Sequence, residues 1–178
     1  MSGGDLAGRE TSARLSPCRT YRYWLSRTWA PGPTLGWVML NPSTADETVN
    51  DPTIERCERR AAMSGFGGII VVNLFALRST DPRELRRHSD PVGPDNDVAL
   101  TEFGEAAGLI VCAWGNHGAL HGRSRHVREL LAARSPLFAL RVGKTGEPGH
   151  PLYIGYDVQP QLWSAPKLRP DGSPDCGR

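Results

Sequence analysis

Four apolar runs constrain the fold of this chain more than any other feature of its sequence. Each run has the length of a strand and is nearly continuous rather than alternating, which is typical of strands buried on both faces of a parallel sheet. An earlier segment, residues 21–29, alternates between apolar and polar faces and therefore indicates an antiparallel or edge strand. The four runs are LGWVML at 35–40, IIVVNL at 69–74, LIVCA at 109–113 and LFALRV at 137–142.

Helical signals lie between these runs. Asp51 followed by Pro52 is typical of a helix N-terminus, and Gly65 is a typical stop. We expect helices over residues 52–64, 96–107 and 124–134. The alternation of strands and helices predicts an α/β fold with three layers, α/β/α, around a central, mainly parallel four-stranded sheet.

Length and composition limit the organisation of the chain. Its 178 residues fit one compact domain. Gly, Ser and charged residues dominate residues 1–17, where we expect a disordered tail. Residues 164–178 contain few core-forming side chains and are expected to form a flexible tail. The folded domain is therefore expected over residues 18–163.

Charge and cysteine content restrict the partners and the compartment. The formal net charge of +2 leaves room for a local basic patch and does not by itself indicate a nucleic-acid-binding protein. The cysteines at 18, 57, 112 and 176 are too far apart to suggest a disulfide framework or a zinc site. No run approaches the ~20 apolar residues that a membrane-spanning helix needs. We expect a cytoplasmic, monomeric protein with no membrane association.

Polar side chains follow each of the four apolar runs. In an open parallel sheet, ligands bind beyond the carboxyl ends of the strands, so these residues are expected to form one rim. Each has an ordinary structural explanation as a turn or a helix cap, but Asn73 is unusual because a buried amide needs partners. The closely spaced histidines at 117, 121 and 126 do not form a convincing metal triad. The rim residues are Asn41, Ser43, Thr44 and Asp46, then Asn73, Arg78 and Ser79, then Trp114, Asn116 and His117, and finally His150.

The motifs LNPSTAD, VVNLFALRSTDP, CAWGNHG and HPLY carry a family resemblance. Over about residues 18–163 the chain resembles the bacterial family of unknown function numbered 1643. The order of the motifs is also similar to that of the uracil-DNA glycosylase superfamily, which has a parallel four-stranded sheet flanked by helices. MLNPS at 39–43 resembles the Gly-Ile-Asn-Pro-Gly motif of its mismatch-specific branch, with Met39 and Ser43 in place of the glycines. Leu152 replaces the serine of its His-Pro-Ser motif.

The resemblance implies a metal-independent, DNA glycosylase-like hydrolase that flips a uracil or modified pyrimidine base out of DNA and cleaves its N-glycosidic bond, as in base-excision DNA repair. It implies catalytic roles for Asn41 or Asp46, which would act on water, and for His150, which would donate to the departing base. The cysteines do not match the iron–sulfur branch, and we expect no cofactor. Base contacts would come from Asn73 and from Phe75 or Trp114, and phosphate or DNA contacts from Ser43, Thr44, Arg78, Ser79 and Asn116.

Two alternatives remain open from the sequence. One is an enzyme that uses the same pocket on a free nucleoside, a nucleotide or another small molecule, as the weak net charge and Leu152 favour. The other is a non-catalytic protein that binds a modified base. Fold analogy does not distinguish among the three.

Overall fold

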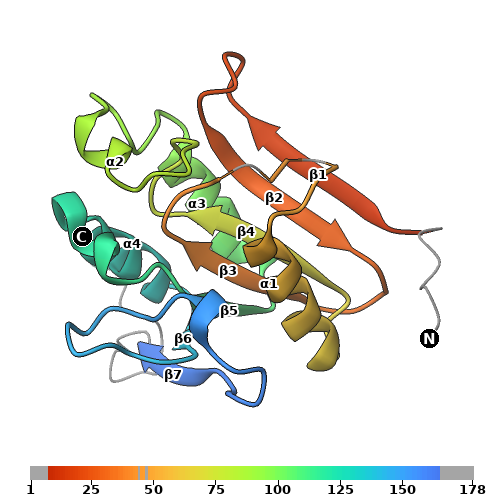
Figure 1. The fold of residues 1–178 in the computed structure, drawn as a ribbon. Coiled ribbons are helices and arrows are strands. Elements are labelled where there is room, and N and C mark those ends of the chain that lie inside the picture. Colours follow the sequence, from red (N-terminus) through yellow and green to blue (C-terminus); the bar gives the residue numbers. More distant parts are fainter. Residues whose placement is uncertain (1–7, 44, 47, 165–178) are drawn as a thin grey trace.

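The four apolar runs form four neighbouring parallel strands at the centre of the molecule (Figure 1). The structure is a computed structural model that describes residues 8–43, 45–46 and 48–164. The central strands, in spatial order, are β4 (Gly68–Asn73), β3 (Thr34–Met39), β5 (Leu109–Cys112) and β6 (Leu137–Ala139). The α/β class and the parallel centre are therefore confirmed.

The sheet is wider than the four strands that we expected. Within the described residues it has seven strands and is mixed, in the order β1-β2-β4-β3-β5-β6-β7. On one side, β1 (Glu10–Leu15) and β2 (Arg22–Thr28) run antiparallel to their neighbours, and on the other side β7 (Gln161–Ser164) is antiparallel to β6. The alternating segment is thus antiparallel, as expected, but it lies inside the sheet.

The additional edge strands correct the expected boundaries of the domain. Residues 10–15, which we expected in a disordered tail, pair with β2 as strand β1. Strand β1 is mostly exposed and polar, so main-chain hydrogen bonds hold it and an apolar pattern does not reveal it. Strand β7 has only four residues, of which Trp163 packs against the core, and it is too short to give a clear pattern. The remaining parts of the expected tails, residues 1–7 and 165–178, lie outside the described residues.

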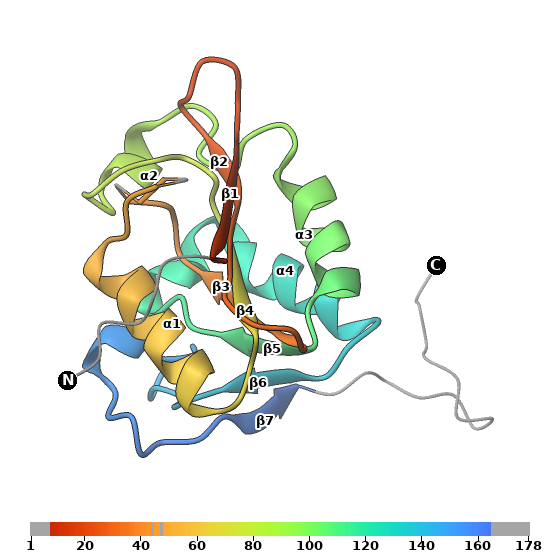
Figure 2. The same cartoon turned by 90° about the vertical axis from the view of Figure 1, so that its right-hand side faces the viewer.

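Helices cover both faces of the sheet (Figure 2). Helix α1 (Pro52–Met63) packs on one face, where Ile54 and Cys57 join a buried cluster with Trp37 of β3. Helices α3 (Asn96–Ala106) and α4 (Arg123–Ala132) pack on the other face. The three expected helices are confirmed to within two residues at each end. Shorter helices, α2 (Glu84–Arg87), η1 (Asn116–Gly122) and η2 (Pro151–Tyr153), lie in connecting segments.

Close packing explains the glycine inside β3. A Cβ atom at Gly36 would lie 2.7 Å from both Phe103 and Ala107, so only a residue without a side chain lets α3 approach β3 this closely. No helix within the described ranges is long and apolar enough to cross a membrane.

The connections between the strands create a crevice at one end of the sheet. The chain leaves β3 through α1 and returns to β4 on one side, whereas it leaves the adjacent β5 through α4 and returns to β6 on the other side. Two adjacent parallel strands whose connections leave in opposite directions open a crevice at their carboxyl ends, where ligands bind in open α/β sheets.

Candidate active site

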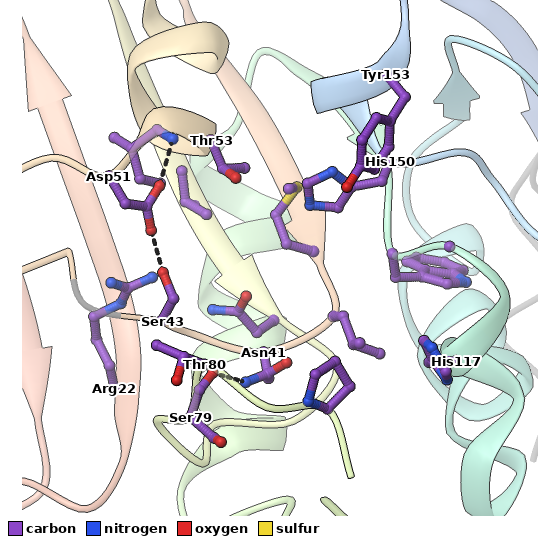
Figure 3. Close-up of a pocket in the computed structure, with 18 residues that line it drawn as sticks. Arg22, Asn41, Ser43, Asp51, Thr53, Ser79, Thr80, His117, His150 and Tyr153 are labelled. Carbon is purple, nitrogen blue, oxygen red and sulfur yellow. Dashed lines mark hydrogen bonds between the residues drawn. The ribbon is translucent and has the colours of Figure 1, made fainter. Parts of the chain in front are cut away.

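A cavity of about 440 Å³ lies at the carboxyl ends of β3, β4 and β5 (Figure 3). Its volume falls within the range of ligand pockets. The wall combines apolar side chains with amides, hydroxyls, imidazoles, one guanidinium and one carboxylate. It is formed by Arg22, Met39, Leu40, Asn41, Ser43, Asp51, Thr53, Ile54, Val71, Asn73, Ser79, Thr80, Pro82, Trp114, Gly115, His117, His150 and Tyr153.

Asn41 follows β3 and is held in one orientation. Its Nδ2 group donates to the carbonyl oxygens of Ser79 at 2.8 Å, Pro42 at 3.1 Å and Leu77 at 3.4 Å. Three surrounding acceptors fix the NH₂ group on the side of this loop, which decides the orientation of the amide. The carboxamide oxygen is then left as an acceptor for a water molecule or a ligand.

Asn73 ends β4 and is only 1% exposed. Its backbone is firmly held, because Asn96 Nδ2 donates to the carbonyl oxygens of Asn73 at 3.0 Å and Leu74 at 2.9 Å. Its own Nδ2 group has no hydrogen-bond partner among the described residues. A buried unpaired amide costs about 1–3 kcal/mol. A polar ligand in the cavity would supply the missing partner.

His150 lies on the far wall of the cavity, at the N-terminus of η2. Its Nδ1 accepts a hydrogen bond from the backbone N–H of Leu152 at 3.3 Å, so in the neutral ring Nε2 carries the proton. Burial lowers the pKa of His150 below its ordinary 6.5, and the negative charge of Asp51 opposes this shift. His150 is therefore a neutral hydrogen-bond donor at pH 7.

Arginines of α1 hold the segment that carries His150. Arg56 donates to the carbonyl oxygens of Pro151 at 2.9 Å and Ile154 at 2.7 Å. Arg60 donates to Gly155 at 2.8 Å and to Val158 at 2.7 Å. Hydrogen bonds from charged donors are among the stronger ones in proteins, so α1 and the loop after β6 are held as one unit.

Ser43 and Asp51 form a hydrogen-bonded pair on the opposite wall (Figure 3). The Ser43 hydroxyl donates to Oδ2 of Asp51, and Oδ1 of Asp51 accepts from the backbone N–H of Ile54 at 2.9 Å. Asp51 is thus the N-cap of α1, as the sequence predicted, and it also lines the cavity.

Several residues that the sequence placed in the site lie elsewhere. Asp46 caps its own turn, where Oδ1 accepts from the backbone N–H groups of Thr48 and Val49, both at 2.9 Å. These two bonds, in that order, hold the pKa of Asp46 below its ordinary value. Phe75 is fully buried in the core and does not line the cavity.

Only some of the residues expected to contact phosphate line the cavity. Ser43 and Ser79 line the cavity, whereas Arg78 and Asn116 do not. The Asn116 carboxamide oxygen accepts from the Thr145 hydroxyl at 2.7 Å. Thr44 lies outside the described residues.

Trp114 lines the cavity as expected, but its ring is firmly packed. It is 2% exposed, its indole N–H donates to Glu147, and its ring meets that of Trp163 edge to face at 5.5 Å between centroids. The ring is therefore held in place, and a ligand could contact only the part of it that faces the cavity.

Sequence reasoning missed Arg22, Asp51, Thr53 and Tyr153 as parts of the wall. Asp51 and Thr53 lie at a helix N-terminus, which already explains their polar side chains. Arg22 lies in an alternating strand, where a polar residue is expected on the exposed face. Tyr153 belongs to the HPLY motif, is 82% exposed, and its ring centroid lies 6.0 Å from that of His150. An exposed aromatic residue beside a histidine in a short motif was a signal that could have been used.

The cavity wall offers a poor donor set for a metal ion. Within the described parts of the chain, no group of three or more histidine, cysteine, aspartate or glutamate side chains could hold one. The wall instead offers amide, hydroxyl and imidazole groups, which suit recognition of a polar organic ligand.

Comparison with known proteins adds a family to this description. Neither the curated proteins nor the solved structures contain a match to the chain. The family model described as "Protein of unknown function (DUF1643)" matches residues 22–152, which include Asn41, Asn73 and His150. The match covers more than half of the chain, and the protein therefore belongs to the DUF1643 family.

Proposed function

We propose that this protein hydrolyses the N-glycosidic bond of a uracil or modified pyrimidine base flipped out of DNA, as enzymes of the uracil-DNA glycosylase superfamily do. One observation carries the proposal: Asn41, Asn73 and His150, from three distant motifs, line one cavity at the carboxyl ends of parallel strands. The wall also presents an unpaired buried amide, which a ligand would satisfy.

The reaction breaks the bond between the base nitrogen and C1′ of the sugar, and water adds its oxygen to C1′. The sugar becomes cation-like, the base leaves with the bonding electron pair, and a proton from water is lost. Such a site needs a positioned water molecule and stabilisation of the developing negative charge, rather than a covalent intermediate.

Asn41 is suited to position the water, because its Nδ2 group is occupied by three carbonyls and its carboxamide oxygen remains an acceptor. Asp51 replaces Asp46 as the carboxylate that could take the proton. Asp51 lines the cavity, whereas Asp46 caps a turn outside it. A carboxylate within reach of the attacking water is a suitable general base.

His150 and Asn73 would recognise the base. The neutral His150 donates through Nε2 and would bond a carbonyl oxygen as it gains negative charge. The carboxamide of Asn73 offers a donor and an acceptor side by side, which complement the N–H and C=O groups on the Watson–Crick edge of uracil.

The test is base release from DNA. The purified chain, with a chelator present, is incubated with oligonucleotides carrying uracil or a panel of modified pyrimidines. We expect an alkali-labile abasic site with at least one base, and loss of most activity in Asn41→Ala and His150→Ala. Arg125→Gln is the matched control, because Arg125 is 83% exposed on α4 and pairs with Glu129. No release from any base with the wild type would refute the proposal for DNA.

A second candidate, a hydrolase of free nucleotides, is favoured by one observation. Arg22, a buried cation, lies in the cavity wall itself, whereas the expected DNA-contacting residues Arg78 and Asn116 lie outside it. Release of base from a free nucleotide, but not from an oligonucleotide, would support this candidate. Tight binding of a modified duplex without release would instead indicate a non-catalytic binder.

A further inference from the structure

Arg22 is an unusual component of the cavity wall. It lies at the start of β2 and is only 2% exposed. Its Nη1 donates to the carbonyl oxygen of Ala45, whereas its Nε has no partner among the described residues. Figure 3 shows the guanidinium pointing toward Ser43 and Asp51. A buried guanidinium with an unused donor is costly unless something pairs with it.

Arg22 brings a positive charge into the cavity wall, and charged side chains of both signs act on it. Burial lowers the pKa of Arg22 to about 10, so the side chain stays charged at neutral pH. The carboxylates of Asp51 and Asp46 act on it favourably, and the guanidinium groups of Arg78 and Arg27 act against it.

The two carboxylates are also occupied. Asp51 already accepts from the Ser43 hydroxyl and from the Ile54 N–H. Asp46 is bonded to its own turn. An incoming anion would therefore meet donors that these carboxylates do not fully engage.

The first turn of α1 adds donors at the same end. This 12-residue helix begins at Pro52, and Thr53 lines the cavity. Pro52 has no N–H group, and the N–H groups of Ile54 and Glu55 both donate to Asp51. The N–H of Thr53 is therefore the first-turn donor that remains for a ligand, and the helix dipole favours an anion there. The Thr53 hydroxyl supplies a further donor.

We propose that the Arg22 end of the cavity is a subsite for the phosphate of a nucleotide. The guanidinium of Arg22 and the first turn of α1 at Thr53 hold the phosphate. His150 and Tyr153 line the opposite side of the cavity, where the base would lie (Figure 3). The assignment of the base end rests on the proposed function, whereas the phosphate end rests on Arg22 and α1.

Two sources would present this phosphate. It is a terminal monoester in a free nucleotide and a diester in a DNA strand. Arg22 is buried and bonded to the loop at Ala45. A terminal phosphate can reach it from the cavity, whereas a diester would also have to fit the next nucleotide beside that loop. The monoester is therefore expected to bind more tightly.

Binding of inorganic phosphate to the full chain tests the subsite independently of the base. Calorimetric titration should show phosphate binding to the wild type and to Arg125→Gln, and none to Arg22→Gln. No binding to the wild type, or undiminished binding to Arg22→Gln, would overturn the proposal. If circular dichroism shows that Arg22→Gln is unfolded, Thr53→Ala must weaken phosphate binding instead, and an unchanged affinity would be equally decisive.

Binding of nucleotides then tests the phosphate end and the base end of the cavity together. We expect deoxyuridine monophosphate to bind the wild type at least about tenfold more tightly than deoxyuridine, and the two to bind Arg22→Gln almost equally. An oligonucleotide with internal deoxyuridine that competes as well as the monoester would identify the diester as the source. If deoxyuridine binds and its monophosphate binds no more tightly, the phosphate subsite is refuted and the proposed function is not. Arg22-dependent phosphate binding without pyrimidine binding or release refutes the proposed function alone.

Discussion

Two asparagines of the cavity differ in how their amides are satisfied. Asn41 donates to three backbone carbonyls and so ties the loop after β3 to the segment 77–79. Asn73 is buried with an unused Nδ2 group. The first amide contributes to the stability of the fold as well as to the site, whereas the unused Nδ2 group of the second costs free energy in the unliganded protein.

This difference predicts opposite effects on stability. Asn41→Ala should lower the free energy of unfolding by about 1–2 kcal/mol, because it leaves carbonyl groups without their donor. Asn73→Leu should leave the free energy of unfolding unchanged or raise it by about 1 kcal/mol, because it removes an unpaired polar group. Both should lose activity. Denaturant unfolding of both variants measures the two changes in the free energy of unfolding. Strong destabilisation by Asn73→Leu would show that its amide is satisfied in the folded protein.

His150 predicts a dependence of stability on pH. Its pKa in the folded protein lies below 6.5, so the unfolded chain binds more protons between that lowered value and pH 6.5. The free energy of unfolding therefore rises with pH through this window and loses the contribution as the pH falls. Unfolding of the wild type and of His150→Gln across pH 5 to 8 should differ in slope within the window. Identical slopes would exclude a lowered pKa.

At this scale the sequence predicted the convergence of Asn41, Asn73 and His150, because residues that follow parallel strands meet at one edge of the sheet. It placed Asp46 in the site and gave Asp51 only the role of a helix cap. Both suit a turn or a cap, and only the path of the loop decides which carboxylate reaches the cavity.

Among the elements, α1 organises the cavity. Its N-cap Asp51 and its first turn form one wall, and Arg56 and Arg60 hold the segment that carries His150 on another. A single helix therefore fixes the relative position of the two ends of the site. The sequence predicted the helix and its cap, but a pattern of apolar positions does not reveal what its arginines bind.

Substitutions at Asp51 separate its two roles. Asp51→Asn keeps a side-chain oxygen at the N-cap but removes the negative charge near the buried Arg22, whereas Asp51→Ala removes both. Asp51→Ala should therefore lower the free energy of unfolding by about 1 kcal/mol more than Asp51→Asn does. If Asp51 takes the proton from water, both variants lose activity by about 10²-fold or more. Steady-state rates measure the loss of activity, and thermal unfolding measures the change in stability. Full activity in Asp51→Asn would show that Asp51 acts only as a helix cap.

In the whole molecule, the central strands were predictable because burial on both faces leaves continuous apolar runs. Strand β1 was not, since its exposed, polar residues are held by main-chain pairing, and the four residues of β7 are too few to give a pattern. The same limit applies to Arg22, whose burial depends on the loop at Ala45 rather than on its own strand pattern. The topology opens the crevice between β3 and β5 in which the candidate site lies.

Mass-spectrometric detection of the free base tests the proposed hydrolysis most directly. Wild type and Asn73→Leu, which is expected to stay folded, are incubated with the same pyrimidine substrates in the presence of a chelator. We expect free base and an abasic product to accumulate in equal amounts with the wild type, and at a rate about 10²-fold lower with Asn73→Leu. No free base from any substrate with the wild type, or equal rates for both proteins, would contradict this expectation.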